Sequence, residues 1–499
     1  MTEIILSSEQ KYAFDKYLEG KNIFITGPGG TGKSALIKKI YHHATVRNKN
    51  IRVTALTGCA ALLLDCESRT LHSWAGIGLG TKSAEALAKS ILNNKKKRTN
   101  WRSTQILVID EISMMSKKLF ELLFDIAQIV RNDRRAFGGI QVIFSGDFYQ
   151  LPPIGNRMEE DSVKFCFESP YWSDLFKKDC VIQLVKIFRQ KDSVYSEILN
   201  QIREGKIKKS SNNILNELVG RKVPEDYIIK PTKLFPIKMS VEQINNYEIE
   251  KIDSKVYEYK IKTVDMYESL TKSQREMRNL YFTKIDIEAE QEYLLNNTNF
   301  DHLLRLKKGC QVMCMINITN SDDEIIICNG SQGIIVDIND INIPLVKFNN
   351  GITTLIGPAN QESDKIPGIC IVQIPLILSW ALTIHKSQGT TLEAAEIDAG
   401  KGIFECGQTY VALSRVKSLE GLFLSSFDVS KIKINKKVKE FYESLKVDNT
   451  YNEKEEKNEE KVFEKIEKTD NTQQVNVCDN NVNKSIFSKF EYKEDNYDS

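Results

Sequence analysis

Residues 22–34 read NIFITGPGGTGKS and decide the fold of this chain. The apolar first part predicts a buried strand, and the run ALIKKI at residues 35–40 predicts a helix that follows at once. The loop between them is rich in glycine and ends in Lys33 and Ser34. Such a loop turns backbone N–H groups toward phosphates, and the helix adds the positive end of its dipole. The stretch therefore predicts a nucleoside triphosphate site, in which Lys33 reaches the β- and γ-phosphates and the Ser34 hydroxyl binds Mg²⁺.

Further apolar runs predict parallel strands beside this one, and residues 117–130 predict an amphipathic helix between two of them. The predicted strands are residues 51–56, 106–109 and 140–144. Residues 1–185 are thus predicted to form a doubly wound α/β domain, with a small insertion at about residues 60–80. Ligands of such sheets bind beyond the carboxyl ends of the strands, where the glycine-rich loop lies.

An acidic pair, Asp110-Glu111, follows the predicted strand at 106–109 directly. We expect Asp110 to hold Mg²⁺, directly or through water, and Glu111 to orient or deprotonate an attacking water. An acidic pair that merely opens a loop is the weaker interpretation, because a phosphate loop precedes it in the same predicted domain. The pair therefore favours a hydrolytic nucleotide site.

The second half of the chain has a different pattern. Residues 186–240 and about 365–430 predict a second α/β domain, split by an insertion at 241–364. Short strand-like runs separated by turns predict a small β-barrel at about residues 303–357. The predicted strands of this barrel include residues 311–315, 333–336 and 345–348.

The composition is that of an ordinary globular protein, with 41% apolar and 27% charged residues and a net charge of +2. The charge is uneven, because residues 447–499 carry 14 acidic and 8 basic side chains, which leaves +8 on the rest. A basic body is compatible with nucleic-acid binding. The acidic end has few apolar residues and is predicted to be a disordered tail.

Membrane insertion and disulfide bonds are not expected. No apolar run reaches the ~18 residues that span a bilayer, and the start of the chain has no signal-peptide pattern. We therefore expect a soluble, intracellular protein without a membrane partner. Ten cysteines without a C-x-x-C spacing predict reduced, partly buried thiols.

The motifs, taken in chain order, resemble those of Pif1-like helicases of superfamily 1B. The matching stretches, besides the glycine-rich loop and the acidic pair, are LSSEQ (6–10), TALTGCAA (54–61), TLHSWAGIG (70–78), a signature over 117–142 that ends in FGGIQV, GDFYQLPP (146–153), FRQ (188–190), SWALTIHKSQGTT (379–391) and YVALSRV (410–416). The resemblance implies an α/β fold with two RecA-like P-loop NTPase domains. In this arrangement residues 1–185 form domain 1A with a small 1B insertion, residues 186–240 and 365–430 form domain 2A, and the 2B insertion holds an SH3-like barrel.

The resemblance also implies roles in binding ATP and Mg²⁺. Gln10 would read the adenine, and Gln150 would sense the γ-phosphate or its water. Arg189 and Arg415 would reach across the cleft from the second domain, where a guanidinium stabilises the charge of the transferring phosphoryl group. The other implied nucleotide-binding residues are Gly27, Gly29, Gly30, Thr31, Gly32 and Gly389.

A DNA track is implied beside this site. The implied strand-binding residues are Thr57, His72, Ser73, His385, Lys386, Ser387, Tyr410 and Ser414. Each histidine could instead be a structural residue, and Phe148, Tyr149 and Trp380 could stack on bases or belong to the core. The basic run Lys95–Arg98 is expected on a loop, where it contacts nucleic acid, acts as a nuclear address or is simply solvated. Residues 64–69 lack the glycines that the family often carries near its strand-separating pin.

The resemblance implies an ATP-dependent 5′→3′ DNA helicase that acts on single-stranded and forked DNA in replication, repair or recombination. G-quadruplexes and RNA–DNA hybrids are further candidate substrates, and the nucleus or another site of DNA replication is the expected location. Two alternatives stay open. One is a RecD- or Dda-like helicase, which the signature FGGIQ at 137–141 disfavours. The other is a non-hydrolysing, ATP-switched DNA-binding protein, which the complete set of hydrolytic residues disfavours.

Overall fold

The computed structural model describes residues 6–446, except 65, 79, 157, 191, 225–229, 297, 299, 320–324, 328, 364 and 365. The chain divides into two compact units, Met1–Lys439 and Glu440–Ser499. Every strand found among the described residues belongs to the first unit. The predicted acidic tail at 447–499 lies outside the described residues.

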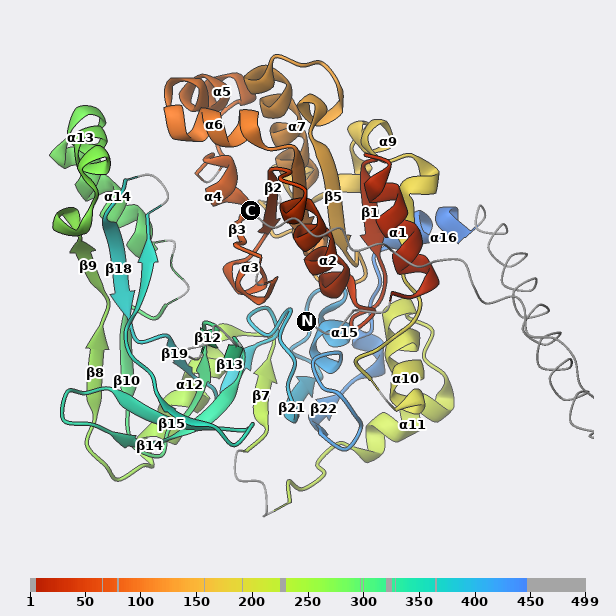
Figure 1. Ribbon diagram of the computed structural model, residues 1–499. Coiled ribbons are helices and arrows are strands. Elements are labelled where there is room, and N and C mark those ends of the chain that lie inside the picture. The colour runs from red at the N-terminus through yellow and green to blue at the C-terminus, as the bar shows by residue number, and fades with distance from the viewer. Residues whose placement is uncertain are drawn as a thin grey trace, which may run out of the picture. The chain divides into compact units, whose positions relative to one another are not determined.

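A six-stranded parallel sheet contains the strand predicted just before the glycine-rich loop (Figure 1). The strand order is β3-β2-β4-β5-β1-β6. The strands are β1 (Ile23–Thr26), β2 (Ile51–Ala55), β3 (Arg69–Thr70), β4 (Ile106–Asp110), β5 (Gln141–Gly146) and β6 (Val181–Gln183). All four strands predicted from apolar runs are confirmed. The chain leaves β1, β4 and β5 at the same edge, where the predicted nucleotide-binding residues follow.

The continuous apolar run of β1 reflects a strand that is buried on both faces. Ile23 and Ile25 pack with Leu36 of α2 (Lys33–Val46) in one hydrophobic cluster. Phe24 points to the other face, where its ring centroid lies 5.3 Å from that of Phe148. The strand that leads into the phosphate loop is therefore fixed from both sides.

Helices surround this sheet. The helix predicted at 117–130 is confirmed as α7, which Ser116 caps by accepting a hydrogen bond from Leu119 N. Helix α7 spans Lys117–Arg131, and the other helices of this region are α1 (Ser8–Leu18), α3 (Gly58–Leu64), α4 (Leu71–Ala75), α5 (Ala84–Asn93), α6 (Lys95–Ser103), α8 (Glu160–Val163) and α9 (Tyr171–Leu175).

The basic run Lys95–Arg98 forms the first turn of α6, so the prediction that it lies on a loop was wrong. Asn94 caps this helix through a hydrogen bond from Lys97 N, and the fully buried Trp101 anchors it. The Lys97 ammonium donates to Gly76 O at 2.8 Å. Capping and a single buried aromatic thus outweigh the repulsion among the lysines.

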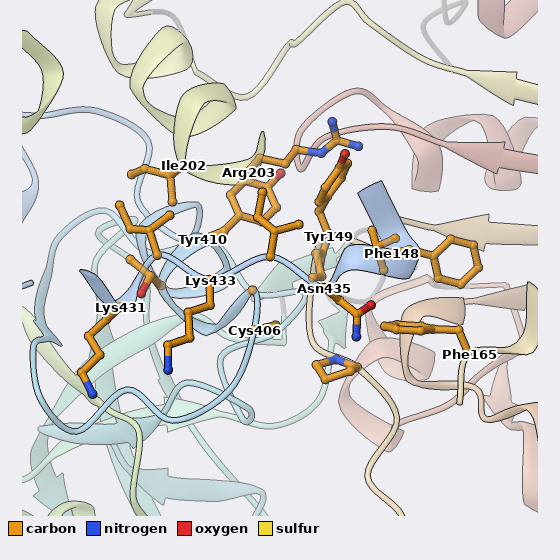
Figure 2. Close-up of a pocket in the computed structure, with 17 residues that line it drawn as sticks. Phe148, Tyr149, Phe165, Ile202, Arg203, Cys406, Tyr410, Lys431, Lys433 and Asn435 are labelled. Carbon is orange, nitrogen blue, oxygen red and sulfur yellow. The ribbon is translucent and has the colours of Figure 1, made fainter. Parts of the chain in front are cut away.

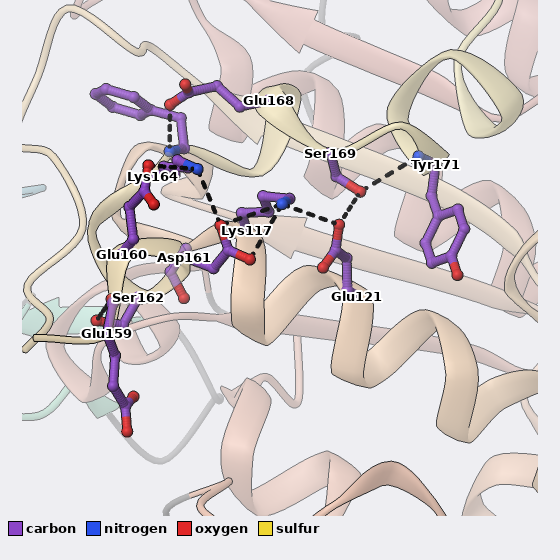
Figure 3. A network of polar contacts seen from close by, with 12 residues as sticks. Lys117, Glu121, Glu159, Glu160, Asp161, Ser162, Lys164, Glu168, Ser169 and Tyr171 are labelled. Atoms are coloured by element: carbon purple, nitrogen blue, oxygen red, sulfur yellow. Dashed lines mark hydrogen bonds and ion pairs between the residues drawn. The ribbon is translucent and has the colours of Figure 1, made fainter.

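A polar network fastens the segment after β5 to the start of α7 (Figure 3). Lys117 Nζ lies 3.1 Å from the Asp161 carboxylate, and Lys164 Nζ lies 3.2 Å from the same residue. Ser169 Oγ donates to Glu121 Oε1 at 2.8 Å. Exposed ion pairs contribute little individually, but this network joins two segments that flank the acidic pair and residues 146–153.

A second parallel sheet has the order β20-β7-β21-β22. Its strands are β7 (Thr232–Phe235), β20 (Ala381–Thr383), β21 (Ala395–Ala399) and β22 (Leu422–Phe427). The helices of this part are α10 (Ser193–Glu204), α11 (Lys209–Glu217), α12 (Lys238–Glu250), α15 (Gln408–Leu413) and α16 (Lys436–Lys446). After the insertion, the chain was predicted to return to this sheet at about residue 365, but the first strand that does so begins at Ala381. The strands before it, β18 and β19, pair with strands of the inserted region instead.

The inserted region is antiparallel. Its five-stranded sheet has the order β16-β15-β14-β11-β19, which confirms the strands predicted at 311–315, 333–336 and 345–348. The inserted strands are β8 (Tyr257–Lys260), β9 (Lys262–Asp265), β10 (Leu303–Leu306), β11 (Gln311–Cys314), β12 (Ile318–Thr319), β13 (Ile325–Ile327), β14 (Gln332–Ile338), β15 (Pro344–Phe348), β16 (Thr353–Leu355), β17 (Ala359–Glu362), β18 (Ile369–Gln373) and β19 (Leu376–Leu378). Two helices, α13 (Lys272–Tyr281) and α14 (Lys284–Asn296), accompany the sheet β17-β18-β9, and α14 packs on β18 (Figure 1).

The seven cysteines described here are free thiols, and six of them are buried, which agrees with the sequence prediction. Within the described part of the chain, no helix is long and apolar enough to cross a membrane.

Candidate functional site

The phosphate loop lies between β1 and α2, as predicted. Its backbone curls through left-handed conformations at Gly30 (φ 88°) and Gly32 (φ 80°), which only glycine adopts readily. A Cβ on Gly30 would lie 2.5 Å from Arg189 Cβ, so no other residue fits between the loop and the segment at 188–190. Thr31 is buried and its hydroxyl donates to Pro28 O at 3.0 Å.

Lys33 is the first residue of α2 and folds back over the loop. Its ammonium donates to Gly27 O at 2.7 Å and to Pro28 O at 2.9 Å. Burial lowers the pKa of this ammonium, while nearby Asp147 and Glu111 oppose the decrease. The positive charge thus sits above the loop, where it would meet a phosphate.

Gln10 is buried on the other side of the loop. Its amide nitrogen donates to Thr31 O at 3.1 Å, and its amide oxygen accepts a hydrogen bond from Ser7 N. The helix α1 therefore reaches the phosphate loop through this side chain. Its predicted role in reading the adenine stays a prediction.

The acidic pair follows β4. Asp110 is buried, and burial together with the neighbouring Glu111 raises its pKa to about 6. Glu111 adopts a left-handed backbone (φ 54°, ψ 43°), which turns its side chain away from the strand. Among the described residues, no group of three or more His, Cys, Asp or Glu could hold a metal ion alone.

A cation that arrives bound to a nucleotide needs fewer protein ligands than one that the protein holds alone. Mg²⁺ in such sites takes one or two protein oxygens and completes its shell with phosphates and water. Asp110 fits this role, because it offers a buried carboxylate at the end of β4, directly before Glu111. Burial and that neighbour raise its pKa, so a cation at this place would stabilise the ionised form. The Ser34 hydroxyl is exposed in the first turn of α2, as the same role requires.

The loop after β5 holds Asp147 and Gln150, both buried. Asp147 forms a bidentate ion pair with Arg203 of α10, at 2.8 and 2.9 Å. The same guanidinium lies 4.5 Å from the centre of the Tyr149 ring. Gln150 Oε1 is buried and has no hydrogen-bond partner among the described residues. Sequence reasoning missed Arg203, because a lone arginine in a helical run carries no signal of its partner.

Two arginines approach the phosphate loop from beyond the first sheet. Arg189 Nη1 and Arg415 Nη2 lie 3.8 and 3.9 Å from the position that a Cβ on Gly29 would take. Burial lowers the pKa of both, that of Arg415 to about 10, and Glu111 opposes the decrease in each. The structure thus brings the predicted arginines and the predicted catalytic carboxylate to one place.

Helix α15 meets the first sheet's loops directly. The hydroxyl of Tyr410 accepts a hydrogen bond from Gly29 N at 2.9 Å. At the helix N-terminus, a Cβ on Gly407 would lie 2.4 Å from Tyr149 O. Tyr410, which was predicted to lie on the DNA track, is buried and contacts the phosphate loop, and its role toward DNA stays a prediction.

A narrow pocket lies beside this contact. Figure 2 shows Tyr149, Arg203 and Tyr410 grouped on one side of it, with Lys431 and Lys433 pointing away from them. Phe148 and Phe165 lie at the other end. The pocket therefore belongs to the junction between the loop after β5 and α15.

The predicted strand-binding residues divide by burial. Ser387 and Ser414 are buried, and their hydroxyls donate to Ile384 O and Val411 O. Lys386 is exposed, and His385 is half-buried with its pKa lowered by burial. The remaining members, which are partly exposed, are Thr57, His72 and Ser73.

Two of the three aromatic candidates for base stacking belong to the core. Phe148 packs edge-on against Phe165 and Trp172, and Trp380 lies in the hydrophobic cluster of the inserted sheet. Tyr149 is partly exposed and lies against the Arg203 guanidinium. Because Phe148 and Trp380 are buried, they are core residues and are not available to stack on bases.

The segment at 379–391 also contacts the acidic pair. Gln388 Nε2 donates to Glu111 Oε2 at 3.1 Å. Gly389, predicted to bind nucleotide, follows in a left-handed conformation (φ 83°). Sequence reasoning did not assign Gln388, since its position directly after three predicted strand-binding residues suggested no link to the carboxylate.

Residues 5–213 match the PIF1-like helicase family, and residues 292–338 match the DNA helicase Pif1, 2B domain. The chain is 34% identical to the ATP-dependent DNA helicase PIF1 of Emericella nidulans, over 87% of this chain and 62% of that protein. It is 32% identical to the ATP-dependent DNA helicase RRM3 of Saccharomyces cerevisiae, over 89% of this chain and 68% of that protein. The chain thus spans about two thirds of the length of these relatives.

Solved structures have the same fold. The crystal structure of Pif1 helicase from Candida albicans matches with a TM-score of 0.73 and 36% identity, covering 89% of this chain and 100% of that one. Pif1 helicase from Bacteroides, in complex with ADP-AlF3 and ssDNA, matches with a TM-score of 0.62 and 27% identity, covering 90% and 99%. The mixed α/β fold with parallel sheets is therefore shared across these proteins.

Proposed function

The chain belongs to the PIF1-like helicase family, and we propose that it is an ATP-dependent DNA helicase. The observation that carries this proposal is the meeting of Arg189 and Arg415 with Gly29 of the phosphate loop. Arg189 comes from the segment between β6 and α10, and Arg415 comes from the segment between α15 and β22 of the second sheet. Guanidinium groups supplied from these segments make hydrolysis depend on how the second sheet approaches the phosphate loop. Such a dependence is what a motor needs and a static nucleotide binder does not.

Each residue has a distinct part in hydrolysis. The loop amides and Lys33 bind the phosphates, and Glu111 orients or deprotonates the attacking water. Arg189 and Arg415 stabilise the charge that develops on the transferring phosphoryl group. Mg²⁺ held through Asp110 and Ser34 would supply charge neutralisation between the phosphates.

Hydrolysis is proposed to move a DNA strand because α15 and the segment at 379–391 contact both the nucleotide site and solvent. Lys386 is exposed two residues before Gln388, which reaches Glu111. A Bacteroides Pif1 helicase has been solved with ADP-AlF3 and ssDNA together. We propose single-stranded and forked DNA as the substrates of this chain.

Finer properties rest on the family resemblance. These are 5′→3′ movement, unwinding of G-quadruplexes and RNA–DNA hybrids, nuclear or DNA-associated location, and an SH3-like barrel in the inserted region. The five-stranded antiparallel sheet is compatible with such a barrel. The complete hydrolytic set disfavours a non-hydrolysing ATP switch.

Strand displacement tests the proposal. A duplex with a 5′ single-stranded overhang and a matched duplex with a 3′ overhang are incubated with protein, ATP and Mg²⁺, with and without a G-quadruplex in the duplex arm. We expect ATP-dependent displacement from the 5′ overhang only. Displacement without hydrolysable ATP, or none from any substrate, would overturn the helicase proposal, whereas 3′ activity would overturn only the polarity.

A further inference from the structure

One hydrogen bond links the segment of the predicted DNA track to the carboxylate proposed to act on the attacking water. Gln388 Nε2 donates to Glu111 Oε2 at 3.1 Å, although the two residues are 277 positions apart. Gln388 is only 4% exposed. A hydrogen bond to an ionised carboxylate in a poorly solvated site is among the stronger polar contacts in proteins.

The backbone of Glu111 is fixed by its surroundings. A left-handed backbone at a non-glycine residue is unfavourable and persists where packing holds it. The next residues, Ile112 and Ser113, are fully buried in a short 3-10 turn. The carboxylate can therefore change position mainly by rotating its side chain, and Gln388 is its hydrogen-bond partner in the described part of the chain.

The backbone around Gln388 is also fixed, by hydrogen bonds within residues 384–390. Ser387 Oγ donates to Ile384 O at 2.8 Å, and Thr390 Oγ1 donates to Ser387 O at 2.7 Å. Gln388 N donates to His385 O. These bonds make residues 384–390 one tight unit, so that a force on His385 or Lys386 is transmitted to the Gln388 amide.

The Gln388 amide also has unused capacity. Its Oε1 is buried and has no hydrogen-bond partner among the described residues. An unpaired buried acceptor is unfavourable, which favours any state in which it gains a donor. The amide can thus hold Glu111 through Nε2 and still accept a hydrogen bond from a water beside the carboxylate.

We propose that Gln388 is a positioning residue that couples strand binding at His385 and Lys386 to the orientation of Glu111. This inference rests on the proposed function and names how DNA stimulates hydrolysis at the same site. A purely structural Gln388 would instead close the junction between the sheets without affecting stimulation.

The test replaces the amide while keeping its length. Gln388→Met removes both the donor and the acceptor, and Gln388→Glu keeps the size but places a charge beside Glu111. Gln141→Met is the matched control, because it removes two hydrogen bonds to Tyr17 O and Lys21 O at the far end of β5. ATP turnover is measured with and without saturating oligo(dT), together with the KM for ATP and the Kd for the oligonucleotide.

We expect both Gln388 variants to lower the ratio of stimulated to basal turnover by about fivefold or more, a typical size for coupling between two sites. The KM for ATP and the Kd for the oligonucleotide should stay near wild type, and Gln141→Met should keep full stimulation. Unchanged stimulation in either folded Gln388 variant would overturn the inference, as would equal losses in the Gln141 control. Wild-type protein without oligonucleotide-stimulated turnover would instead overturn the proposed function.

Discussion

The residues predicted to bind nucleotide and those predicted to bind DNA differ in how the structure treats them. The nucleotide set converges: Lys33, Glu111, Arg189 and Arg415 meet around one loop, although they come from four separate segments. The DNA set divides into buried, internally bonded side chains and partly exposed ones. Phosphoryl transfer requires charged groups in a fixed geometry. A surface that binds a DNA strand requires hydrogen-bond donors that are exposed to solvent.

Tyr410 shows that a residue's place in a motif and its burial can point to different contacts. Its motif lies near predicted DNA contacts, but its hydroxyl accepts a hydrogen bond from the phosphate loop and the side chain is buried. A match to a motif indicates where a segment lies, and burial indicates which of its side chains can touch a ligand. The following changes test each side of the comparison.

The largest effect is expected for Lys33→Ala. Removing the ammonium above the loop deletes the charge that binds the phosphates, so oligonucleotide-stimulated ATP turnover should fall below detection. Binding of a single strand at low salt should survive, because the exposed track is unchanged. Lys49→Ala, an exposed lysine after α2, is the control. Persistent turnover in Lys33→Ala would show that the nucleotide site lies elsewhere.

The next largest loss of ATP turnover is expected for Arg415→Ala. A guanidinium on the transferring phosphoryl group is typically worth ~10³–10⁵ in rate, so turnover should fall by at least about 10³ while ATP binding changes little. Arg415→Lys keeps a charge and should retain more activity. Equilibrium binding of ATP and steady-state turnover separate the two effects, and a loss of less than about tenfold would exclude the proposed role.

Arg203→Met tests the contact that fixes the loop after β5. Removing one partner leaves Asp147 buried and unpaired, which costs about 3–5 kcal/mol in comparable ion pairs. The urea midpoint of unfolding should therefore decrease markedly. Combining Arg203→Met with Asp147→Asn should cost less than the two single changes together. Simple additivity in this cycle would contradict the ion pair.

Tyr410→Phe distinguishes the two sides most sharply. Losing the hydroxyl that joins α15 to Gly29 N removes one hydrogen bond of about 0.5–1.5 kcal/mol, so the KM for ATP should rise by up to about tenfold. The Kd for a single strand should stay at its wild-type value. A weaker strand affinity with an unchanged KM would return Tyr410 to the DNA track.

The smallest effect is expected for Lys386→Ala. This exposed lysine should contribute one phosphate contact, so strand affinity should fall a few-fold and the salt slope should decrease by about one. Binding is measured by fluorescence anisotropy across a salt series, with Lys49→Ala as the reference. An unchanged salt slope would remove Lys386 from the track.

Much of the fold could be predicted from the sequence because its strands are short, continuous apolar runs. The four predicted strands of the first sheet were found, since burial on both faces keeps most of their positions apolar. The loop prediction at Lys95–Arg98 failed, because a cap at Asn94 and the buried Trp101 outweigh local charge. The exact return to the second sheet was also missed, since β18 and β19 are as apolar as β20.

The site could be predicted from the sequence only where the residues that act together are close together in the chain. The glycines, Lys33 and the acidic pair carry their chemistry in adjacent residues. Arg203 and Gln388 act through partners 56 and 277 positions away. A single sequence contains no record of such distant pairs, so only the folded chain reveals them.

We propose that ATP hydrolysis in this chain depends on a bound DNA strand. The most direct measurement is steady-state ATP turnover by the wild-type protein with and without saturating oligo(dT). We predict stimulation of about tenfold or more, within the usual range of coupling between sites, and its complete loss in Lys33→Ala. Turnover that is indifferent to the oligonucleotide, or stimulation that survives in Lys33→Ala, would contradict the account.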